Sequence, residues 1–480
     1  MTVISHSFTE DILGDLDATD IAALIAAKQV DPVEVLAASI QRSKLVAPAI
    51  HAVVDECYEQ AMVVGRINTT APFAGVPTFI KDLCDVAGMH TRYGSAAFSQ
   101  VKPAQRNDPL VDQFVDLGLV VLGKSSTPEF GFSCSAEPAP ELGGQTRNPW
   151  NTGHSAGGSS SGAAALVAAG VVPIAHAADG GGSIRIPASA CGLVGLKPSR
   201  GRIYPAQLFK TQLIRIASDG VVTRSVRDTA RFYSEIEKLY RNTKLEPIGT
   251  DIRPLSRKLR FGVVTESVRG QSIDTPTQNA IDETIVLLTS LGHQVERMKI
   301  SNPDTIAADM IHYWKMNAFL LKKVGGKPID PSFDSSRMTP LTDGLAAEYA
   351  RNILRTPGAL YRLRKSYRDY AKMFENIDIL VTPCVNHLTP EIGHLSETLD
   401  CDTLFERVRK WAGFPGYANA TGAPSISLPL SHDTTTNLPI GILFGADHGC
   451  DRLLLELAYQ LEEAQPRRKI QGGNCGSSGV

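Results

Sequence analysis

The chain has eight cysteines, yet no two of them form a Cys-x-x-Cys pair. They are scattered singly, a pattern that indicates neither a zinc site nor a disulfide framework and is typical of reduced thiols. The eleven histidines show no metal-ligand spacing either. We therefore expect no metal and no cofactor.

Long apolar runs and blocks of one charge are also missing. No uninterrupted apolar stretch approaches the roughly 20 residues that span a bilayer, and the first residues lack the basic start and apolar stretch of a signal peptide. The net charge is only −2 and no basic block occurs, so nothing indicates binding to nucleic acid or to an anionic membrane. The sequence predicts a cytoplasmic protein of enzyme size, with neither nucleic acid nor membrane as a partner.

What the 480 residues do contain is a mixture of helix and strand patterns, which predicts an α/β protein. A periodic segment at 19–28, with Thr19 as its expected N-cap, predicts a helix. A second helix is predicted from Asp31 and Pro32 to about residue 46, because proline is favoured at the first helical position. Further helices are predicted at 275–291 and 451–463, and strands at 119–123, 260–264, 378–383 and 425–429.

The most informative motif is Asp-Gly-Gly-Gly-Ser-Ile-Arg-Ile-Pro at 179–187. Gly180, Gly181 and Gly182 leave the backbone without side-chain cover, so successive N–H groups can converge on one point as an oxyanion hole. Ser183 would stand beside that hole as a nucleophile. Because a serine hydroxyl is a poor nucleophile at neutral pH, it needs a base within hydrogen-bond reach.

A lysine is the expected base, since no histidine partner is evident. Lys81, in the largely apolar segment 75–82, can serve only when it is neutral, a state that burial away from acids favours. Asp82 beside it acts against this, yet neighbouring side chains in an extended segment point to opposite faces. Lys124 is a weaker candidate for the same role.

A serine-rich run at 157–162 supplies a further hydroxyl. It formally matches the Gly-x-Ser-x-Gly elbow of α/β-hydrolases, but that elbow requires a strand directly before it, and the polar residues 148–155 predict none. Two serine motifs and a lysine instead suggest acyl transfer by an unusual triad.

At this point the sequence resembles the amidase signature enzymes over most of its length. The segments 144–151 and 389–393 look most like bacterial amidases similar to 6-aminohexanoate cyclic-dimer hydrolase. The resemblance implies one α/β domain over 1–470, a central mixed β-sheet flanked by helices on both faces, with the signature core at about 70–230. A disordered tail is expected at 471–480. The motifs that carry the resemblance are 75–82, 123–124, 127–130, 144–150, 157–162, 179–187, 191–198, 419–429 and 438–441.

The resemblance also implies a Ser–Ser–Lys triad. Ser183 would be the acylated nucleophile, Ser159 the bridging serine and Lys81 the base. The peptide bond between Gly158 and Ser159 would be cis, and Arg185 would support the nucleophile loop. By family position, the residues expected to line the acyl channel are Gly131, Phe132 and Ser133.

The expected activity is hydrolysis of a small-molecule carboxylic amide to an acid plus an amine or ammonia, by a stand-alone enzyme or a homodimer. One alternative is the glutaminase subunit of an aminoacyl-tRNA amidotransferase, which shares the triad but normally carries threonine where Gly180 stands. Another is a non-catalytic binding protein, disfavoured because all three triad residues are present. A set of aromatic residues could shape the far end of the site or simply pack in the core: Tyr313, Trp314, Trp411 and Phe414.

Overall fold

The structure is a computed structural model, and it describes residues 3–63, 70–138, 143–267, 271–300 and 303–470. The tail predicted to be disordered, 471–480, lies outside these residues. Within the described part, no helix combines the length and the apolar character needed to cross a membrane.

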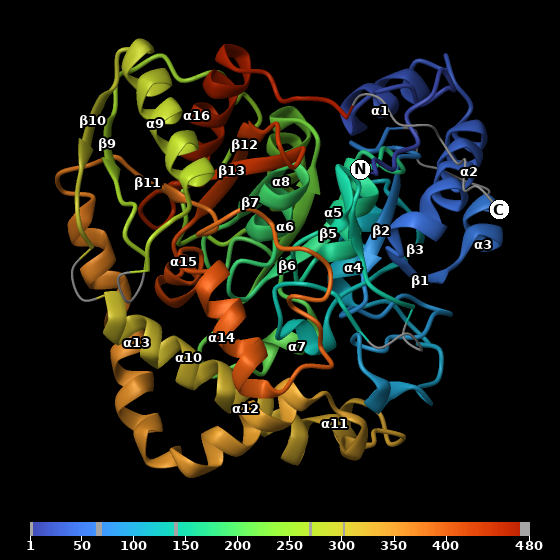
Figure 1. Ribbon diagram of the computed structural model, residues 1–480. Coiled ribbons are helices and arrows are strands. Elements are labelled where there is room, and N and C mark those ends of the chain that lie inside the picture. The colour runs from blue at the N-terminus through green and yellow to red at the C-terminus, as the bar shows by residue number, and fades with distance from the viewer. Residues whose placement is uncertain (1–2, 64–69, 139–142, 268–270, 301–302, 471–480) are drawn as a thin grey trace.

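An eight-stranded mixed sheet forms the centre of the molecule (Figure 1). Its strands follow the order β10-β9-β11-β13-β12-β7-β8-β6. The β10–β9 and β9–β11 pairs are parallel, and every pair from β11 to β6 is antiparallel. The bounds of these strands are β6 Ile174–Asp179, β7 Val194–Lys197, β8 Ser218–Thr223, β9 Arg260–Val263, β10 Gln294–Arg297, β11 Ile379–Pro383, β12 Ser425–Asp433 and β13 Leu438–Gly445.

A three-stranded sheet in the order β1-β3-β2 lies next to the large one. Its edge strand β2 packs against β6, where the Thr78 hydroxyl donates to the Ile174 carbonyl at 3.0 Å. A third sheet consists of two short strands, β4 and β5. The bounds of these strands are β1 Val53–Glu56, β2 Pro77–Lys81, β3 Val120–Ser125, β4 Arg147–Asn148 and β5 Asn151–Ser155.

Helices cover both faces of the large sheet, which confirms the predicted architecture (Figure 1). Successive residues of β8 show the two faces, because Val221 packs in a core with α8 and α16 while Val222 packs in another with α5 and α6. The α-helices are α1 Ala18–Ala26, α2 Pro32–Ile50, α3 Tyr58–Met62, α4 Pro109–Asp116, α5 Ser161–Ala168, α6 Arg185–Cys191, α7 Gln207–Lys210, α8 Val226–Leu239, α9 Thr275–Ser290, α10 Pro303–Leu320, α11 Gly326–Ile329, α12 Pro340–Arg351, α13 Thr356–Met373, α14 Cys401–Trp411, α15 Gly416–Thr421 and α16 Asp451–Ala464.

Two details of the sequence-based prediction are wrong. Helix α1 begins at Ala18, one residue before the predicted start, because its N-cap is Asp17, whose carboxylate accepts the Asp20 N–H. Thr19, the expected N-cap, donates its hydroxyl to Asp228 instead. A strand, β5, does precede the serine-rich run, although its sequence Asn-Thr-Gly-His-Ser has no apolar alternation. It pairs with β4 and not with the large sheet, so the hydrolase elbow is still not formed.

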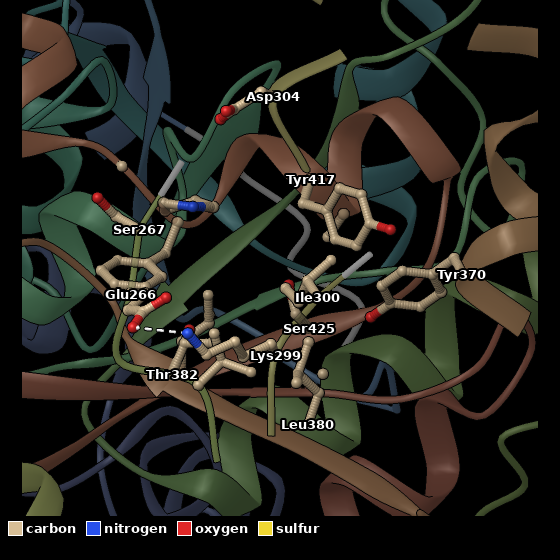
Figure 2. A pocket seen from close by; sticks show the side chains of 17 residues that line it. Glu266, Ser267, Lys299, Ile300, Asp304, Tyr370, Leu380, Thr382, Tyr417 and Ser425 are labelled. Carbon is tan, nitrogen blue, oxygen red and sulfur yellow. Dashed lines mark hydrogen bonds and ion pairs between the residues drawn. The ribbon is translucent and has the colours of Figure 1, made fainter. Parts of the chain in front are cut away.

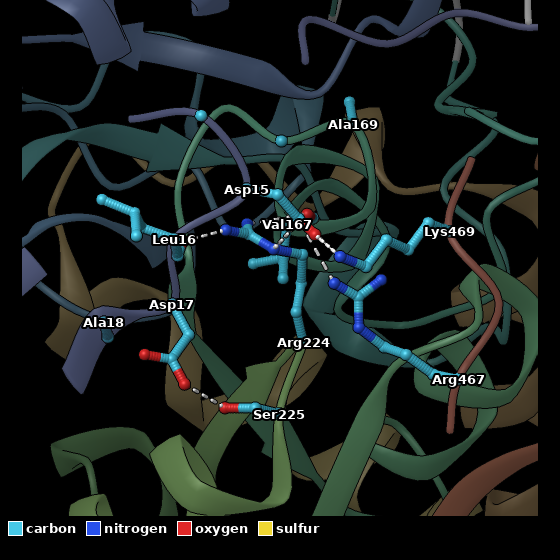
Figure 3. A network of polar contacts seen from close by, with 12 residues as sticks. Asp15, Leu16, Asp17, Ala18, Val167, Ala169, Arg224, Ser225, Arg467 and Lys469 are labelled. Atoms are coloured by element: carbon cyan, nitrogen blue, oxygen red, sulfur yellow. Dashed lines mark hydrogen bonds and ion pairs between the residues drawn. The ribbon is translucent and has the colours of Figure 1, made fainter. Parts of the chain in front are cut away.

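A polar network around Arg224 joins segments from both ends of the chain to the middle (Figure 3). Arg224 is buried, and its guanidinium donates to the carbonyls of Leu16 and Val172 at 2.5 and 2.9 Å. Asp15 lies 3.8 Å from Arg224 and also pairs with Arg467 at 3.3 Å. The residues around 15 and 467 are thereby fastened to the loops beside β6 and β8.

Candidate active site

The predicted nucleophile, Ser183, lies in the short connection between strand β6 and helix α6 (Figure 1). Asp179 ends the strand, and Arg185 begins the helix. The two side chains form a buried two-point ion pair, with Nε and Nη2 of Arg185 each 2.8 Å from a carboxylate oxygen. Burial alone would raise the pKa of Asp179, but Arg185 outweighs it and holds that pKa well below its usual range. The loop is thus closed at its base by a charged clamp, as the resemblance implies for Arg185.

The same carboxylate takes up backbone N–H groups of the loop. Gly182 N–H donates to Asp179 at 2.7 Å, and Ile184 N–H donates to it at 3.1 Å. Gly182 therefore has no free N–H for an oxyanion, which corrects its predicted place in the oxyanion hole. The N–H groups of Gly180, Gly181 and Ser183 have no acceptor among the described residues.

Gly182 is required for the shape of the loop instead. Its φ is +131°, a conformation that residues with side chains rarely adopt. A Cβ at this position would lie 2.7 Å from Ile186 Cδ1 and 2.8 Å from Pro415 Cβ. Any larger residue would displace the helix start or the Pro415 segment.

The predicted base and the predicted bridging serine lie in contact. Lys81, the last residue of β2, places its Nζ 2.7 Å from Ser159 Oγ and 3.0 Å from Ser160 Oγ. The peptide bond between Gly158 and Ser159 is cis, as the resemblance implies. The sequence did not single out Ser160, whose hydroxyl also donates to the Ala178 carbonyl and accepts the Ala178 N–H. Ser160 N–H donates to the Ser183 carbonyl at 3.3 Å, which ties the serine run to the nucleophile loop.

The surroundings of Lys81 favour its neutral form. Its side chain is fully buried, and this burial lowers its pKa from 10.5 to about 7, against the opposing pull of Asp179 and Asp219. The carboxylate of the neighbouring Asp82 pairs with Lys124 Nζ at 2.9 Å, and Asp82 is not among the acids that raise the pKa of Lys81. Lys124, the weaker candidate for the base, therefore forms an ion pair with Asp82.

A second layer lies behind Lys81. The Lys81 N–H donates to His176 Nδ1 at 3.2 Å, and His176 Nε2 lies 3.4 Å from Asp219 Oδ1. Together with Cys84, these two side chains form a buried group whose potential metal-ligand atoms lie within 4.8 Å of one another. Because both ring nitrogens of His176 already have protein partners, we interpret the group as a hydrogen-bonded support between β2, which carries Lys81, and β6, which leads to the Ser183 loop.

The predicted acyl-channel residues lie next to the triad. Gly131 has a φ of +71°, and a Cβ there would lie 3.0 Å from Ser159 Oγ. The Phe132 ring packs edge-on against Trp314, with ring centres 5.5 Å apart. Ser133 is buried, and its hydroxyl has no hydrogen-bond partner within the described residues. This loop is anchored by Glu129, whose carboxylate accepts hydrogen bonds from Ser95, Thr339 and Thr342.

The four aromatic candidates separate into two kinds. Trp314, on α10, covers the nucleophile loop, since a Cβ on Gly180 would lie 3.2 Å from its ring. Tyr313 and Trp411 are core residues: the Tyr313 hydroxyl donates to the Ile214 carbonyl, and the Trp411 indole N–H donates to the His387 carbonyl. Phe414 packs mainly in the core beside α14.

Like Ser160, a residue on α15 had no role assigned from the sequence. Asn419, on α15, donates to the Asp179 carboxylate and carbonyl, both at 2.9 Å, and accepts from Arg185 Nη2 at 2.6 Å. Its only signal was its position in a late motif of the resemblance. Asn419 completes the clamp that closes the nucleophile loop.

Comparison with known proteins agrees with this fold. The chain is an amide-hydrolysing enzyme, since the family model described as Amidase matches residues 34–455. It belongs to that family, the amidase signature enzymes.

Named relatives match over nearly the whole chain. This chain is 43% identical over 472 residues to "Putative amidase AmiC" of Mycobacterium tuberculosis (strain ATCC 25618 / H37Rv), and the match covers 98% of both chains. It is 33% identical over 490 residues to 6-aminohexanoate-cyclic-dimer hydrolase of Paenarthrobacter ureafaciens, covering 94% and 95%. The solved structure of 6-aminohexanoate cyclic dimer hydrolase complexed with substrate superimposes with a TM-score of 0.84 at 30% identity, covering 94% of this chain and 97% of that one. The predicted resemblance to bacterial amidases of this kind is confirmed.

Proposed function

We propose that this enzyme hydrolyses a carboxylic amide to an acid plus an amine or ammonia through an acyl-enzyme on Ser183. The observation that carries the proposal is the 2.7 Å contact between Lys81 Nζ and Ser159 Oγ, in surroundings that lower the pKa of Lys81 to about 7. A lysine with such a pKa is largely neutral just above pH 7 and can accept a proton there.

The proton relay then follows from the order of the groups. Ser183 Oγ attacks the amide carbon and passes its proton to Ser159 Oγ, whose own proton moves to Lys81 Nζ. The proton returns through Ser159 to the leaving nitrogen, the C–N bond breaks and the amine departs. Water, deprotonated by the same relay, attacks the ester on Ser183 and releases the acid.

The negative charge of the tetrahedral intermediates needs donors that are not already used. The N–H groups of Gly180, Gly181 and Ser183 meet this condition, and the clamp formed by Asp179 and Arg185 holds them in place before substrate arrives. Preorganised donors of this kind contribute about 3–4 kcal/mol each to transition-state stabilisation.

The proposed partner is a small-molecule amide, the proposed location is the cytoplasm, and a homodimer is compatible with the proposal. The name of one relative refers to a cyclic dimer of 6-aminohexanoate. Linear and cyclic amides of short amino acids therefore come first among the substrates to test.

The test is hydrolysis of an amide panel, followed by mass spectrometry, in the wild type and in Ser183→Ala. The panel contains short aliphatic, aryl, fatty-acyl and aminohexanoate amides, and glutamine, which tests the glutaminase alternative. The matched control is Ser161→Ala, because the Ser161 hydroxyl accepts the Ala136 N–H and is not among the described hydrogen-bond partners of Lys81 Nζ.

Cleavage by the wild type and the control, absent in Ser183→Ala, is the expected result. Intact-protein mass spectrometry with a slowly released acyl group should then show an adduct on the wild type alone. Full activity in Ser183→Ala would contradict the assigned nucleophile. Cleavage of glutamine alone would favour the glutaminase alternative.

A further inference from the structure

A cavity of about 240 Å³ lies beside the nucleophile loop, against strands β11, β12 and β13 of the large sheet (Figure 2). Its walls are largely apolar, with Leu380 and Leu443 on the strands and the rings of Tyr370 and Tyr417 on α13 and α15. At its mouth Lys299 pairs with Glu266 at 3.2 Å. None of its lining residues belongs to β2, to the serine run or to the loop that carries Ser183, so it is separate from the catalytic groups.

The closed end of the cavity has hydrogen-bond donors without acceptors. Tyr370 is only 2% exposed, and its hydroxyl points toward Ser425 and Leu380 (Figure 2) while lacking a hydrogen-bond partner among the described residues. The Ser425 hydroxyl accepts from Arg185 Nη1 at 2.9 Å, which leaves its own proton to be donated. Hydroxyl donors that line a cavity and have no protein acceptor can donate to a ligand or to water there.

The chemistry of these groups defines what would fit. Two donors at the closed end require an acceptor on the ligand, and the apolar walls require an apolar body of modest size. A small carboxylate and a small carboxamide share this description. They are also the product and the substrate of amide hydrolysis, so their relevance to turnover rests on the proposed function, whereas the binding site itself does not.

The cavity is connected to the nucleophile loop by one side chain. Arg185 Nη1 donates both to Ser425 Oγ and to the Pro415 carbonyl, while its other nitrogens hold Asp179. Asp179 in turn holds the N–H groups of Gly182 and Ile184. A ligand that engages the Ser425 hydroxyl thus acts on the residue that fixes the loop.

We propose that this cavity is a second binding site, which takes a small apolar carboxylate or carboxamide on the hydroxyls of Tyr370 and Ser425 and is coupled to the nucleophile loop through Arg185. A ligand that accepts the Ser425 proton changes the strength of the hydrogen bond between Arg185 and Ser425. This change shifts the position of the nucleophile loop, which Arg185 holds.

Binding is tested by calorimetric titration of benzoate and of benzamide into the Ser183→Ala protein, which leaves the amide intact. Three proteins are compared: Ser183→Ala alone, with Tyr370→Phe, and with Trp314→Ala. Tyr370→Phe removes one donor and keeps the ring in place, whereas Trp314→Ala alters the catalytic side and leaves the cavity unchanged.

The expected result is binding of at least one probe that weakens about tenfold or more with Tyr370→Phe and persists with Trp314→Ala. Preference for benzoate would identify the acid, and preference for benzamide the amide, as the ligand form. Binding that disappears with Trp314→Ala and ignores Tyr370→Phe would place the probe at the catalytic side and overturn the proposal. Absence of binding of both probes would also overturn it, since the cavity would then hold only water.

Coupling is tested separately on proteins with Ser183 intact. The expected result is that the preferred probe changes kcat in the wild type and not in Tyr370→Phe. A probe that raises only KM, equally in both proteins, acts as a competitor at the catalytic site and contradicts the coupling. If neither protein cleaves any amide, the proposed function fails while the calorimetric result stands on its own.

Discussion

Replacing Lys81 by methionine is expected to stabilise the protein at neutral and acidic pH while abolishing activity. Burial lowers the pKa of Lys81 from 10.5 to about 7, which corresponds to about 5 kcal/mol of unfolding free energy at about 1.4 kcal/mol per pH unit. Methionine avoids this cost because it carries no charge. The lost contacts of Nζ with Ser159 and Ser160 offset part of the gain, by about 1 kcal/mol each.

The sign of the pH dependence follows from proton binding. Between pH 7 and 10.5 the unfolded wild type keeps the Lys81 proton and the folded state has lost it, so wild-type stability rises relative to Lys81→Met by about 1.4 kcal/mol per pH unit. The advantage of the variant is therefore largest below about pH 7 and shrinks by about 2.7 kcal/mol over two pH units above it. Lys197, also buried with a pKa lowered to about 7, titrates in both proteins and cancels in the difference.

The assay is urea unfolding of both proteins across this pH range, with the difference in unfolding free energy plotted against pH. Lys124→Met serves as the contrast, because it leaves the buried Asp82 carboxylate without its partner and should cost about 3–5 kcal/mol. A difference between the wild type and Lys81→Met that stays constant with pH would refute the reasoning, because Lys81 would then hold its proton equally in both states.

Three further predictions concern the reaction. With a good amide substrate, kcat/KM should rise with pH through about 7 as Lys81 loses its proton, falling about tenfold per pH unit on the acidic side; an acidic limb near pH 4 would instead point to a carboxylate base. Gly182→Ala should lower kcat by about a hundredfold or more, because its Cβ would collide with Ile186 and Pro415 and displace the oxyanion donors; kcat within twofold of wild type would show that the loop tolerates the change. Trp314→Ala should raise KM for aryl amides by about tenfold, with kcat for the smallest amide changed little, because the ring covers the loop and packs on Phe132; a steady-state comparison of the two substrates checks this.

The parts of the site that the sequence could predict are those with local chemistry. Three glycines before a serine have few other uses, so Ser183 could be singled out from its own motif. A lone lysine is usually a solvated surface charge, so Lys81 could be singled out only together with the serine motifs and the family resemblance. The ion pair of Asp82 with Lys124 could not be foreseen, because it forms between two strands whose pairing no local pattern specifies. It explains why the pKa of Lys81 is lowered even though an aspartate is the next residue.

What the sequence could not provide depends on contacts between distant segments. Asn419 meets Asp179 across 240 residues, and the capture of Gly182 N–H by Asp179 depends on how the loop folds back on the end of β6. Strand β5 escaped prediction because it is polar and short and pairs with an even shorter strand. Hydrophobic periodicity in the sequence reveals an element that is buried on one face, and none of these features contains such a pattern.

The contacts of Arg224 with Asp15 and with the Leu16 carbonyl affect how stable this enzyme is during storage and how it should be handled. A protease that nicked the chain near residue 15 would sever nothing catalytic, yet it would leave the buried Arg224 guanidinium with fewer acceptors, a change that typically costs several kcal/mol. Loss of this N-terminal contact would destabilise the loops beside β6 and β8 without changing any catalytic group. A purification tag should therefore be attached away from residue 15, and activity lost on storage should be traced first to cleavage near that residue.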